Sequence, residues 1–324
     1  MDVAERSSRS SAVADISPDG DVVLIVGPEK IRLRVYSQIL RCASRVFSTM
    51  FEPCWNTDQD HSKALPREIL LPEDDGRAFS IICCVIHHRN DLVPAASTMS
   101  AKGILQIAIV TDKYDLHIAL KYASGLWLRP EVDFLSLKAA GYFIATAFLF
   151  NDADLFAKVA LYLTISFKET YLALLDNDLL SQFIPWKVIY ILEERRNQMR
   201  AEIGQLIIRG MNGRCDCGWG EESSEKYEKL NRKYGPLKMI EVPISHIIEK
   251  IKTITSHTQR YYIEQNINQW CENHKPIDAN SLDRQLKTLK DKMRICLSCI
   301  RTSGTTTLCN LHSAAAAPSA AGGG

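Results

Sequence analysis

The chain has 324 residues, a formal net charge of +1 and 46% hydrophobic residues. This balance excludes a chain-wide basic surface for nucleic acid and an acidic tail, and it supplies enough apolar material for about two domains. The first twenty residues lack the apolar core of a signal peptide, and the longest apolar run, 139–150, is shorter than the roughly 20 residues that span a membrane. We therefore expect no membrane partner and an intracellular protein, in the cytoplasm or the nucleus, whose ten cysteines are reduced or bind metal.

Residues 21–51 carry the clearest local pattern. The apolar run 22–26 predicts a strand, and Gly27-Pro28 predicts a tight turn. Residues 31–35 alternate apolar and basic side chains, which is typical of a second strand. Residues 40–50 then place apolar side chains at helical spacing. The pattern predicts a hairpin that leads into helices.

The elements that follow are expected in a regular order. A short strand at 68–71 precedes an acidic helix cap at 74–76, and the helix after it ends at His87-His88. We expect these two histidines to be an exposed pair at the negative end of the helix dipole. Two further helices are predicted at 101–115, after Ser100 as cap, and at 116–128, before Arg129-Pro130 ends the pattern.

The order of these residues resembles a known family. An Asp at the head of a strand, a second strand and then S-x-x-F-x-x-M-F resemble the BTB/POZ domain of the type widespread in filamentous fungi. The stretch T-D-K-Y-D-L at 111–116, followed by Ala119, Leu120 and Ala123, is similar to a segment of that family's last helices. The resemblance covers about residues 17–128. It implies an α+β class, with a short sheet capped by helices and a mostly helical region after it. It also implies that the interaction residues include Asp21, Tyr36, Ser37, Phe47, Met50 and Phe51.

Asp21 has two interpretations. In the resembled family, the Asp at this position lies in a charged pocket near the homodimer interface, and a His and a basic residue follow the next strand. Here Tyr36 and Ser37 stand at those two positions, so the pocket lacks its basic member unless Arg34 or Arg41 replaces it. The alternative is that Asp21 caps its strand and accepts hydrogen bonds from nearby N–H groups.

The remaining chain is expected to be helical. Three apolar stripes predict helices near 134–144, 151–163 and 186–209, with Gly210 as a C-cap. This annex is similar in position to the BACK-type helices of other BTB proteins. Three more helices are predicted at 222–234, 244–257 and 281–299. The expected regions are a disordered tail 1–17, a BTB/POZ domain 18–129, a helical annex 130–210, a Cys-containing helical module 211–312 and a low-complexity tail 313–324.

The cysteines of the third region suggest a structural zinc site. Cys215-x-Cys217 opens the region and Cys296-x-x-Cys299 closes it, and closely spaced thiolate pairs are how proteins hold zinc tetrahedrally. Cys271 or His274 is an alternate ligand. The competing interpretation is that these cysteines are reduced and serve as small apolar residues, with Cys296 and Cys299 on the inward face of a helix.

The motifs argue against an enzyme. The sequence contains no phosphate-binding Gly-rich loop after a strand, no G-x-S-x-G and no H-E-x-x-H. The expected function is a non-enzymatic protein–protein interaction module, a scaffold or adaptor that self-associates or docks a partner through its BTB domain.

Two alternatives to this function stay open. One is a substrate adaptor of a cullin-type ubiquitin ligase, although residues 87–94 hold no hydrophobic-x-Glu contact motif. The other is a DNA-linked regulator that uses the Cys-rich module and the basic stretch 287–301. A solvated face of an amphipathic helix explains that stretch better, so nucleic acid is not the expected partner.

Overall fold

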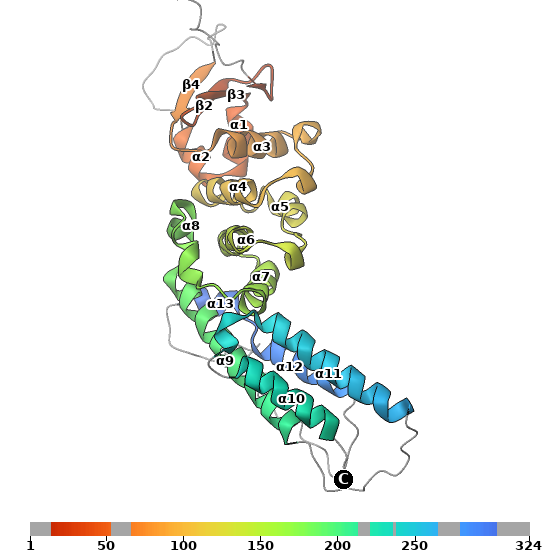
Figure 1. Cartoon of the computed structure of the whole chain (residues 1–324). Coiled ribbons are helices and arrows are strands. Elements are labelled where there is room, and N and C mark those ends of the chain that lie inside the picture. The colour runs from red at the N-terminus through yellow and green to blue at the C-terminus, as the bar shows by residue number, and fades with distance from the viewer. Residues whose placement is uncertain (1–13, 53–65, 213–220, 236–237, 265–278, 303–324) are drawn as a thin grey trace, which may run out of the picture. The chain divides into compact units, whose positions relative to one another are not determined.

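The computed structural model describes residues 14–52, 66–212, 221–235, 238–264 and 279–302 (Figure 1). It is a mixed α+β structure with one small sheet and many helices, which confirms the expected class. The chain divides into two compact units, residues 1–131 with 145–152 and residues 132–144 with 153–324.

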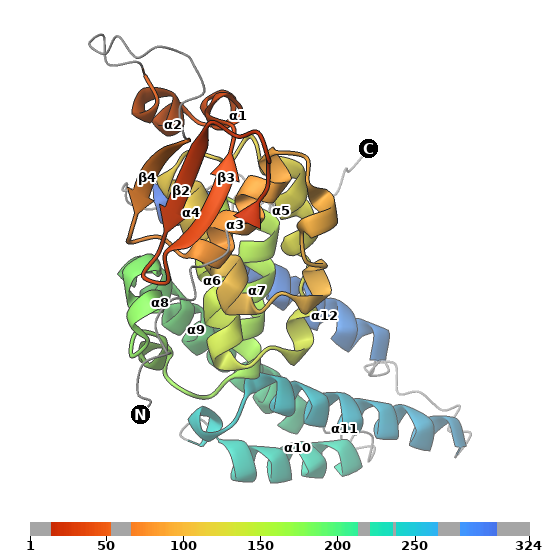
Figure 2. The ribbon, with the colours of Figure 1, turned by 90° about the horizontal axis from the view of Figure 1, so that it is seen from above.

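The first unit holds a four-stranded sheet in the order β1-β3-β2-β4. The central strands β2 and β3 are antiparallel, whereas β1 runs parallel to β3 and β4 runs parallel to β2. Helices α3 and α4 lie behind the sheet in the view of Figure 2. The elements are β1 Ala14–Asp15, β2 Val22–Val26, β3 Ile31–Val35, α1 Ser37–Ala43, α2 Arg45–Met50, β4 Arg67–Leu71, α3 Gly76–Ile86, the 3-10 turns Asn90–Leu92 and Ala96–Thr98, α4 Ala101–Lys113 and α5 Lys121–Trp127.

The predicted hairpin is present. Val22 pairs with Val35 and Val26 pairs with Ile31, and the chain turns at Gly27. Gly27 has a φ of +73°, and a Cβ there would lie 2.8 Å from the backbone oxygen of Asp74. The turn therefore requires glycine both for its backbone angle and for the close approach of the segment before α3.

The prediction of a disordered tail over residues 1–17 is wrong for its last residues. β1 pairs with β3, and Ile16 and Ser17 are buried. Ser17 donates its backbone N–H to the carbonyl of Arg34 at 3.0 Å, and the Arg89 guanidinium donates to the carbonyl of Ile16 at 3.2 Å. The sequence of this stretch lacks an apolar period, so only pairing with a distant strand identifies it. Residues 1–13 lie outside the described residues.

An aromatic cluster fills the core between the first helices and α3. The ring of Phe47 stacks on Tyr114 with centroids 4.8 Å apart and on Phe51 at 5.7 Å, and it meets the edge of Phe79 at 6.1 Å. The Tyr114 hydroxyl donates to the buried carboxylate of Asp74 at 2.7 Å. Phe47 and Phe51 are thus core residues that hold α2 against α3 and α4.

Two predicted helices are shorter than expected. The helix predicted at 116–128 begins only at Lys121, after hydrogen-bonded turns over the preceding five residues. The helix predicted at 281–299 breaks after Lys292. Met293, Ile295 and Leu297 are all buried. Residues two apart lie on opposite faces of a helix, so a straight helix packed on one side could not bury all three.

The second unit is helical throughout its described part. α6 contributes residues to both units, and the other helices belong to the second. The elements are the 3-10 turn Val132–Phe134, α6 Leu137–Phe150, α7 Ala153–Ser166, the 3-10 turn Tyr171–Leu174, α8 Asp178–Phe183, α9 Trp186–Met211, α10 Glu221–Tyr234, the 3-10 turn Met239–Glu241, α11 Ile244–Glu264, α12 Ala279–Lys292 and α13 Leu297–Arg301.

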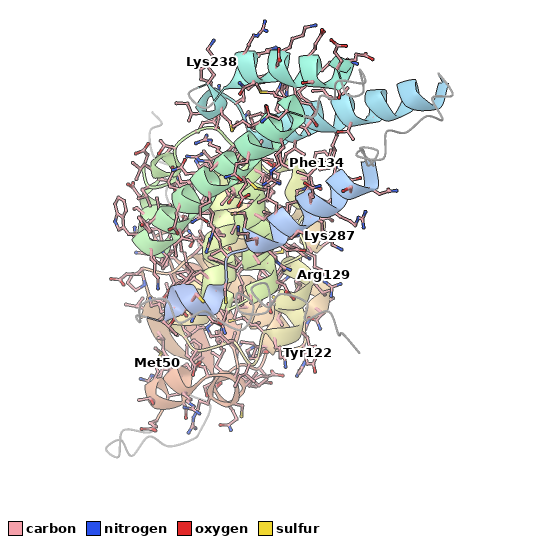
Figure 3. The ribbon with its side chains drawn as sticks, turned by 90° about the horizontal axis from the view of Figure 1, so that it is seen from below. Met50, Tyr122, Arg129, Phe134, Lys238 and Lys287 are labelled. Atoms are coloured by element: carbon pink, nitrogen blue, oxygen red, sulfur yellow. The ribbon has the colours of Figure 1, made fainter. Side chains whose placement is uncertain are left out.

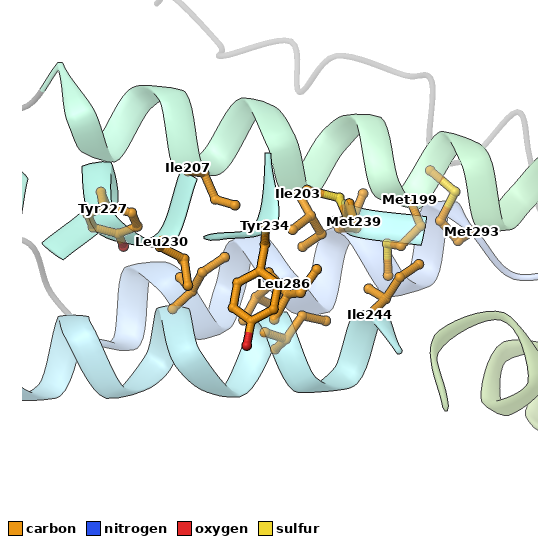
Figure 4. Packing of buried hydrophobic residues seen from close by; sticks show 14 residues of the cluster. Met199, Ile203, Ile207, Tyr227, Leu230, Tyr234, Met239, Ile244, Leu286 and Met293 are labelled. Carbon is orange, nitrogen blue, oxygen red and sulfur yellow. The ribbon is translucent and has the colours of Figure 1, made fainter. Parts of the chain in front are cut away.

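One hydrophobic cluster joins α9 to α10, α11 and α12 (Figure 4). Met199, Ile203 and Ile207 of α9 pack with Tyr227 and Leu230 of α10, and α11 and α12 supply further side chains of the same cluster. The expected boundary at residue 210 therefore does not separate two hydrophobic cores, because α9 shares its core with the helices that follow it.

Gly210 has a different role from the one predicted. α9 continues through Met211, and its C-cap is Asn212, so Gly210 is a helical residue. A Cβ at Gly210 would lie 2.5 Å from the ring of Tyr227. The glycine thus lets the Tyr227 ring pack directly on the backbone of α9, which brings α9 and α10 close together.

The apolar run at 139–150 lies in α6, and Ala140, Ile144 and Ala147 are buried there. This burial agrees with the expectation of a buried helix. Among the described residues, no helix combines the length and the apolar character that crossing a bilayer requires.

Candidate functional site

Asp21 and Ser37, both named from the sequence, meet at the start of α1. The backbone N–H of Ser37 donates to Oδ1 of Asp21 at 2.7 Å, and the Ser37 hydroxyl donates to Oδ2. Tyr36, the N-cap of α1, makes no side-chain cap hydrogen bond of its own. Asp21 supplies the missing acceptor from the head of β2, and a carboxylate also suits the positive end of the helix dipole. This geometry agrees with the capping interpretation of Asp21.

His87, at the end of α3, also contacts the start of α1. The backbone N–H of Tyr36 donates to Nε2 of His87 at 3.1 Å, and Nδ1 lies 2.9 Å from the carbonyl oxygen of Cys83. Nε2 must accept here, so Nδ1 carries the proton and the ring is neutral. Burial lowers the pKa of His87, which favours this neutral form. The predicted exposure is therefore wrong for His87, which is buried, and right for His88.

The two arginines that could have completed a charged pocket, Arg34 and Arg41, are not placed as such a pocket requires. Arg34 directs its Nε to the carbonyl oxygen of Gly20 at 3.0 Å. Nε of Arg41 is buried without a hydrogen-bond partner among the described residues. The Asp21 carboxylate accepts from the N–H and the hydroxyl of Ser37, so it is engaged in capping α1.

A groove opens beside α1, the helix that Asp21 and His87 hold in place. Its volume is about 400 Å³. Among the described residues, no Asp, Glu, Lys or Arg lines it, and His88 and Gln38 are its polar side chains. The lining residues are Gln38, Ile39, Cys42, Ala43, Val85, Ile86, His88 and Ala119.

An exposed apolar stripe lies next to the groove residue Ala119 in the sequence. Ile118 and Tyr122 are each 90% exposed, and Leu126 is 64% exposed. Tyr122 and Leu126 are four residues apart on α5, so they share one face of the helix, and Figure 3 shows Tyr122 at the surface. Ala119, which lines the groove, follows Ile118 directly. We call the groove and this stripe together the α1–α5 surface.

The residues predicted to take part in interactions do not include this stripe. Leu120 and Trp127, in the same stretch of the chain, are buried. The signal that could have found the stripe is the second apolar series, Ile118, Tyr122 and Leu126, on the opposite face. Of the predicted interaction residues, Met50 is half-buried and Tyr36 is exposed.

The proposed zinc ligands fall largely outside the described residues. Cys215, Cys217, Cys271 and His274 lie there, so their geometry is not part of the structure. Cys296 is the N-cap of α13 and Cys299 lies within it, both half-buried, which differs from the expected inward face of one long helix. Among the described residues, no group of three or more His, Cys, Asp or Glu side chains could hold a metal ion.

Lys187, at the start of α9, donates its Nζ to the carbonyl oxygens of Cys299 at 2.7 Å and Thr302 at 2.8 Å. Cys299 therefore lies beside the first turn of α9, whereas Cys215 and Cys217 lie outside the described residues.

Comparison with known proteins adds no identification. No protein-family model matches the chain, and no curated protein matches its sequence. The function must therefore be inferred from the order of the elements and from the α1–α5 surface.

Proposed function

We propose that residues 18–129 form a BTB/POZ-type interaction domain that pairs with a second copy of the chain through the α1–α5 surface. The observation that carries the proposal is the exposure of Ile118 and Tyr122, each 90%, beside a groove that has no Asp, Glu, Lys or Arg among its described lining residues. Burying one large apolar side chain contributes about 1.5–3 kcal/mol, so such a surface gains free energy when a partner covers it.

The order of elements supports the BTB/POZ assignment. The hairpin of β2 and β3 leads into α1 and α2, β4 then joins the sheet, and α3, α4 and α5 follow. This is the order in which the resembling residues occur in the sequence. Ser44, the first residue of the S-x-x-F-x-x-M-F segment, caps α2 by accepting the N–H of Phe47 at 3.1 Å, and Phe47 enters the core. The resembling residues thus have structural reasons for their positions.

A second copy is the occupant that the chemistry of the surface favours. A two-fold dimer brings the same patch of both subunits together, so the patch must be complementary to itself. A patch without lysine, arginine or carboxylate in its groove meets this requirement because no like charges oppose each other across the axis. A charged pocket would instead select a partner of opposite charge.

Asp21 and His87 have a positioning role in this proposal. Both form hydrogen bonds to the start of α1, and α1 is one wall of the groove. They fix this wall from the sheet and from the end of α3. The family's charged-pocket partners are not part of the proposal, because Asp21 already engages Ser37.

Hydrogen exchange at two protein concentrations tests the proposed surface. At tens of micromolar, we expect residues 37–43 and 118–126 to exchange more slowly than at submicromolar concentration, because the dimer covers them. Residues 104–111 of α4 serve as the internal control, because six of these eight residues are buried within the unit. A dimeric mass with unchanged exchange in both stretches would place the interface elsewhere and contradict the proposal.

A further inference from the structure

Helix α13 carries two cysteines on one face. Cys296 is its N-cap and Cys299 follows three residues later, and both side chains are half-buried. Residues three apart on a helix are neighbours, with Cβ atoms about 5–6 Å apart. Leu297 and Ile300 are buried and anchor the helix in the core. The two thiols therefore lie together at the edge of a packed core.

Contacts on two sides hold α13 and the chain that leaves it. The helix packs against α7 (Figure 1). The Nζ of Lys187, at the start of α9, receives the carbonyl oxygens of both Cys299 and Thr302 as hydrogen-bond acceptors. Thr302 is the C-cap of α13, and its backbone N–H donates to the carbonyl of Ser298 at 3.0 Å. The point from which the chain continues to residue 303 is thus fixed beside the two thiols.

The sequence after Thr302 contains a second pair of residues that bind zinc in proteins. Cys309 and His312 form a C-x-x-H pair, with the same spacing as the C-x-x-C pair of α13. Nine residues, 300–308, separate the two pairs, and the low-complexity stretch 313–324 follows His312 directly. Cys309 and His312 lie outside the described residues, so their part in the argument comes from the sequence.

The two pairs together match the ligands of a structural zinc site. Zinc takes four such ligands in a tetrahedron, and three thiolates with one imidazole are among its common sets. Two closely spaced pairs joined by a longer linker are the usual way in which one chain supplies them. A Zn–S bond is about 2.3 Å long, so two thiolates on one ion lie within about 4 Å of each other. Cysteines at neighbouring positions of a helix face can reach that separation by side-chain rotation.

The Cys309–His312 pair competes with Cys215 and Cys217 as the source of the other two ligands. Seven residues lead from Thr302 to Cys309, and they span up to about 23 Å when extended. That length allows the chain to turn back onto the thiols of α13. The C-x-x-H pair also has the two intervening residues that are usual at zinc sites, whereas Cys215 and Cys217 have a single one.

We infer that one structural zinc ion joins the two pairs and fastens the C-terminal stretch to α13. The three thiols lose their protons on binding, and the complex with a neutral imidazole carries one net negative charge. The Lys187 ammonium beside Cys299 stabilises that charge. Two of the four ligands are described, which agrees with the finding that the described residues hold no metal-binding group of three. The site belongs to the second unit and does not depend on self-association of the first.

Metal analysis of the full chain tests the inference. The protein is purified under reducing conditions without a metal-binding tag, loaded with zinc and dialysed. We expect about one equivalent of zinc per chain. Cobalt(II) alone serves as the spectroscopic probe, because tetrahedral thiolate ligation gives it intense visible and charge-transfer absorption. Competition with a chelator of known affinity gives the Kd for zinc.

Variants assign the ligands. Cys309→Ser and His312→Ala should each weaken zinc binding by at least about tenfold, because each removes one of four ligands. His312→Cys should retain the affinity, since a fourth thiolate also completes a structural site. Cys215→Ser and Cys271→Ser are the matched controls, which make the same change at cysteines outside the proposed set and should leave the affinity unchanged. Circular dichroism melting checks that each variant folds.

Three results would overturn the inference. The first is a zinc content well below one equivalent, without the cobalt absorption of a thiolate site. The second is full zinc affinity in Cys309→Ser or His312→Ala. The third is a loss of affinity in Cys215→Ser or Cys271→Ser as large as that in Cys309→Ser, which would assign the zinc to a different set of cysteines.

Discussion

Asp21 accepts two hydrogen bonds from Ser37, one from its backbone N–H at 2.7 Å and one from its hydroxyl. Asp21 stands immediately before β2 and Ser37 begins α1, so one carboxylate connects the sheet to the helix that lines the groove. The pair shows how a residue that resembles a family's pocket residue can serve as a helix cap.

Replacing this carboxylate should loosen the start of α1. We expect Asp21→Ala to lower the free energy of unfolding of the first unit by about 1 kcal/mol, the usual effect of losing a helix N-cap. Hydrogen exchange of residues 37–43 measures the effect locally. Ser37→Ala is the control, and it should cost less because the N–H of residue 37 still reaches Asp21. Equal exchange in the parent and Asp21→Ala would show that the pair does not hold α1.

The buried His87 should make the stability of the first unit depend on pH. Above its ordinary pKa of 6.5, His87 is neutral in both the folded and the unfolded state, and its contribution is constant. Burial, with a smaller effect of His88, lowers the pKa in the folded state. As the pH falls below 6.5, the unfolded state therefore binds a proton first, and the free energy of unfolding falls until the pH passes the lower folded pKa.

Urea unfolding followed at several pH values between about 7.5 and 5 measures this slope. His87→Gln should remove the His87 part of the slope and should cost about 1–3 kcal/mol near neutral pH if the N–H of Tyr36 loses its acceptor. The control is His88→Gln, since His88 is exposed. An unchanged slope in His87→Gln would contradict the assigned role.

Two glycines of α9 should respond in opposite directions to alanine. Gly210→Ala places a Cβ within 2.5 Å of the Tyr227 ring, so we expect a loss of about 1–3 kcal/mol from overpacking, partly offset by the better helix propensity of alanine. At Gly204 the nearest atom to a new Cβ is Cε of Met239 at 4.0 Å. Gly204→Ala should therefore stabilise the helix by up to about 1 kcal/mol. Thermal unfolding of both variants gives the comparison, and a stabilising Gly210→Ala would refute the close packing of α9 and α10.

Local features of this fold could be predicted from the sequence. Asp75 and Ser100 cap α3 and α4 as expected, because a cap depends on residues within one turn. The hairpin also follows from its own residues, through the apolar period of two strands and the glycine between them.

Features that depend on distant contacts could not be predicted. The burial of His87 depends on Tyr36, which is 51 positions away in the chain. The short strand β1 depends on its pairing with β3, and the role of Gly210 depends on Tyr227 in the next helix. The exposure of Tyr122 depends on which face of its helix the rest of the unit covers. No sequence period distinguishes the covered face when both faces carry apolar residues.

Static light scattering of matched variants tests the claim that the α1–α5 surface joins two copies of the chain. Ile118→Asp combined with Tyr122→Asp changes two side chains that are each 90% exposed, so folding should be preserved. Phe134→Asp is the control, because Phe134 is 85% exposed but belongs to the second unit. At tens of micromolar we predict a dimer mass for the parent chain and for Phe134→Asp, and a monomer mass for the double variant. A monomeric parent chain, or a double variant that remains dimeric, would contradict the claim.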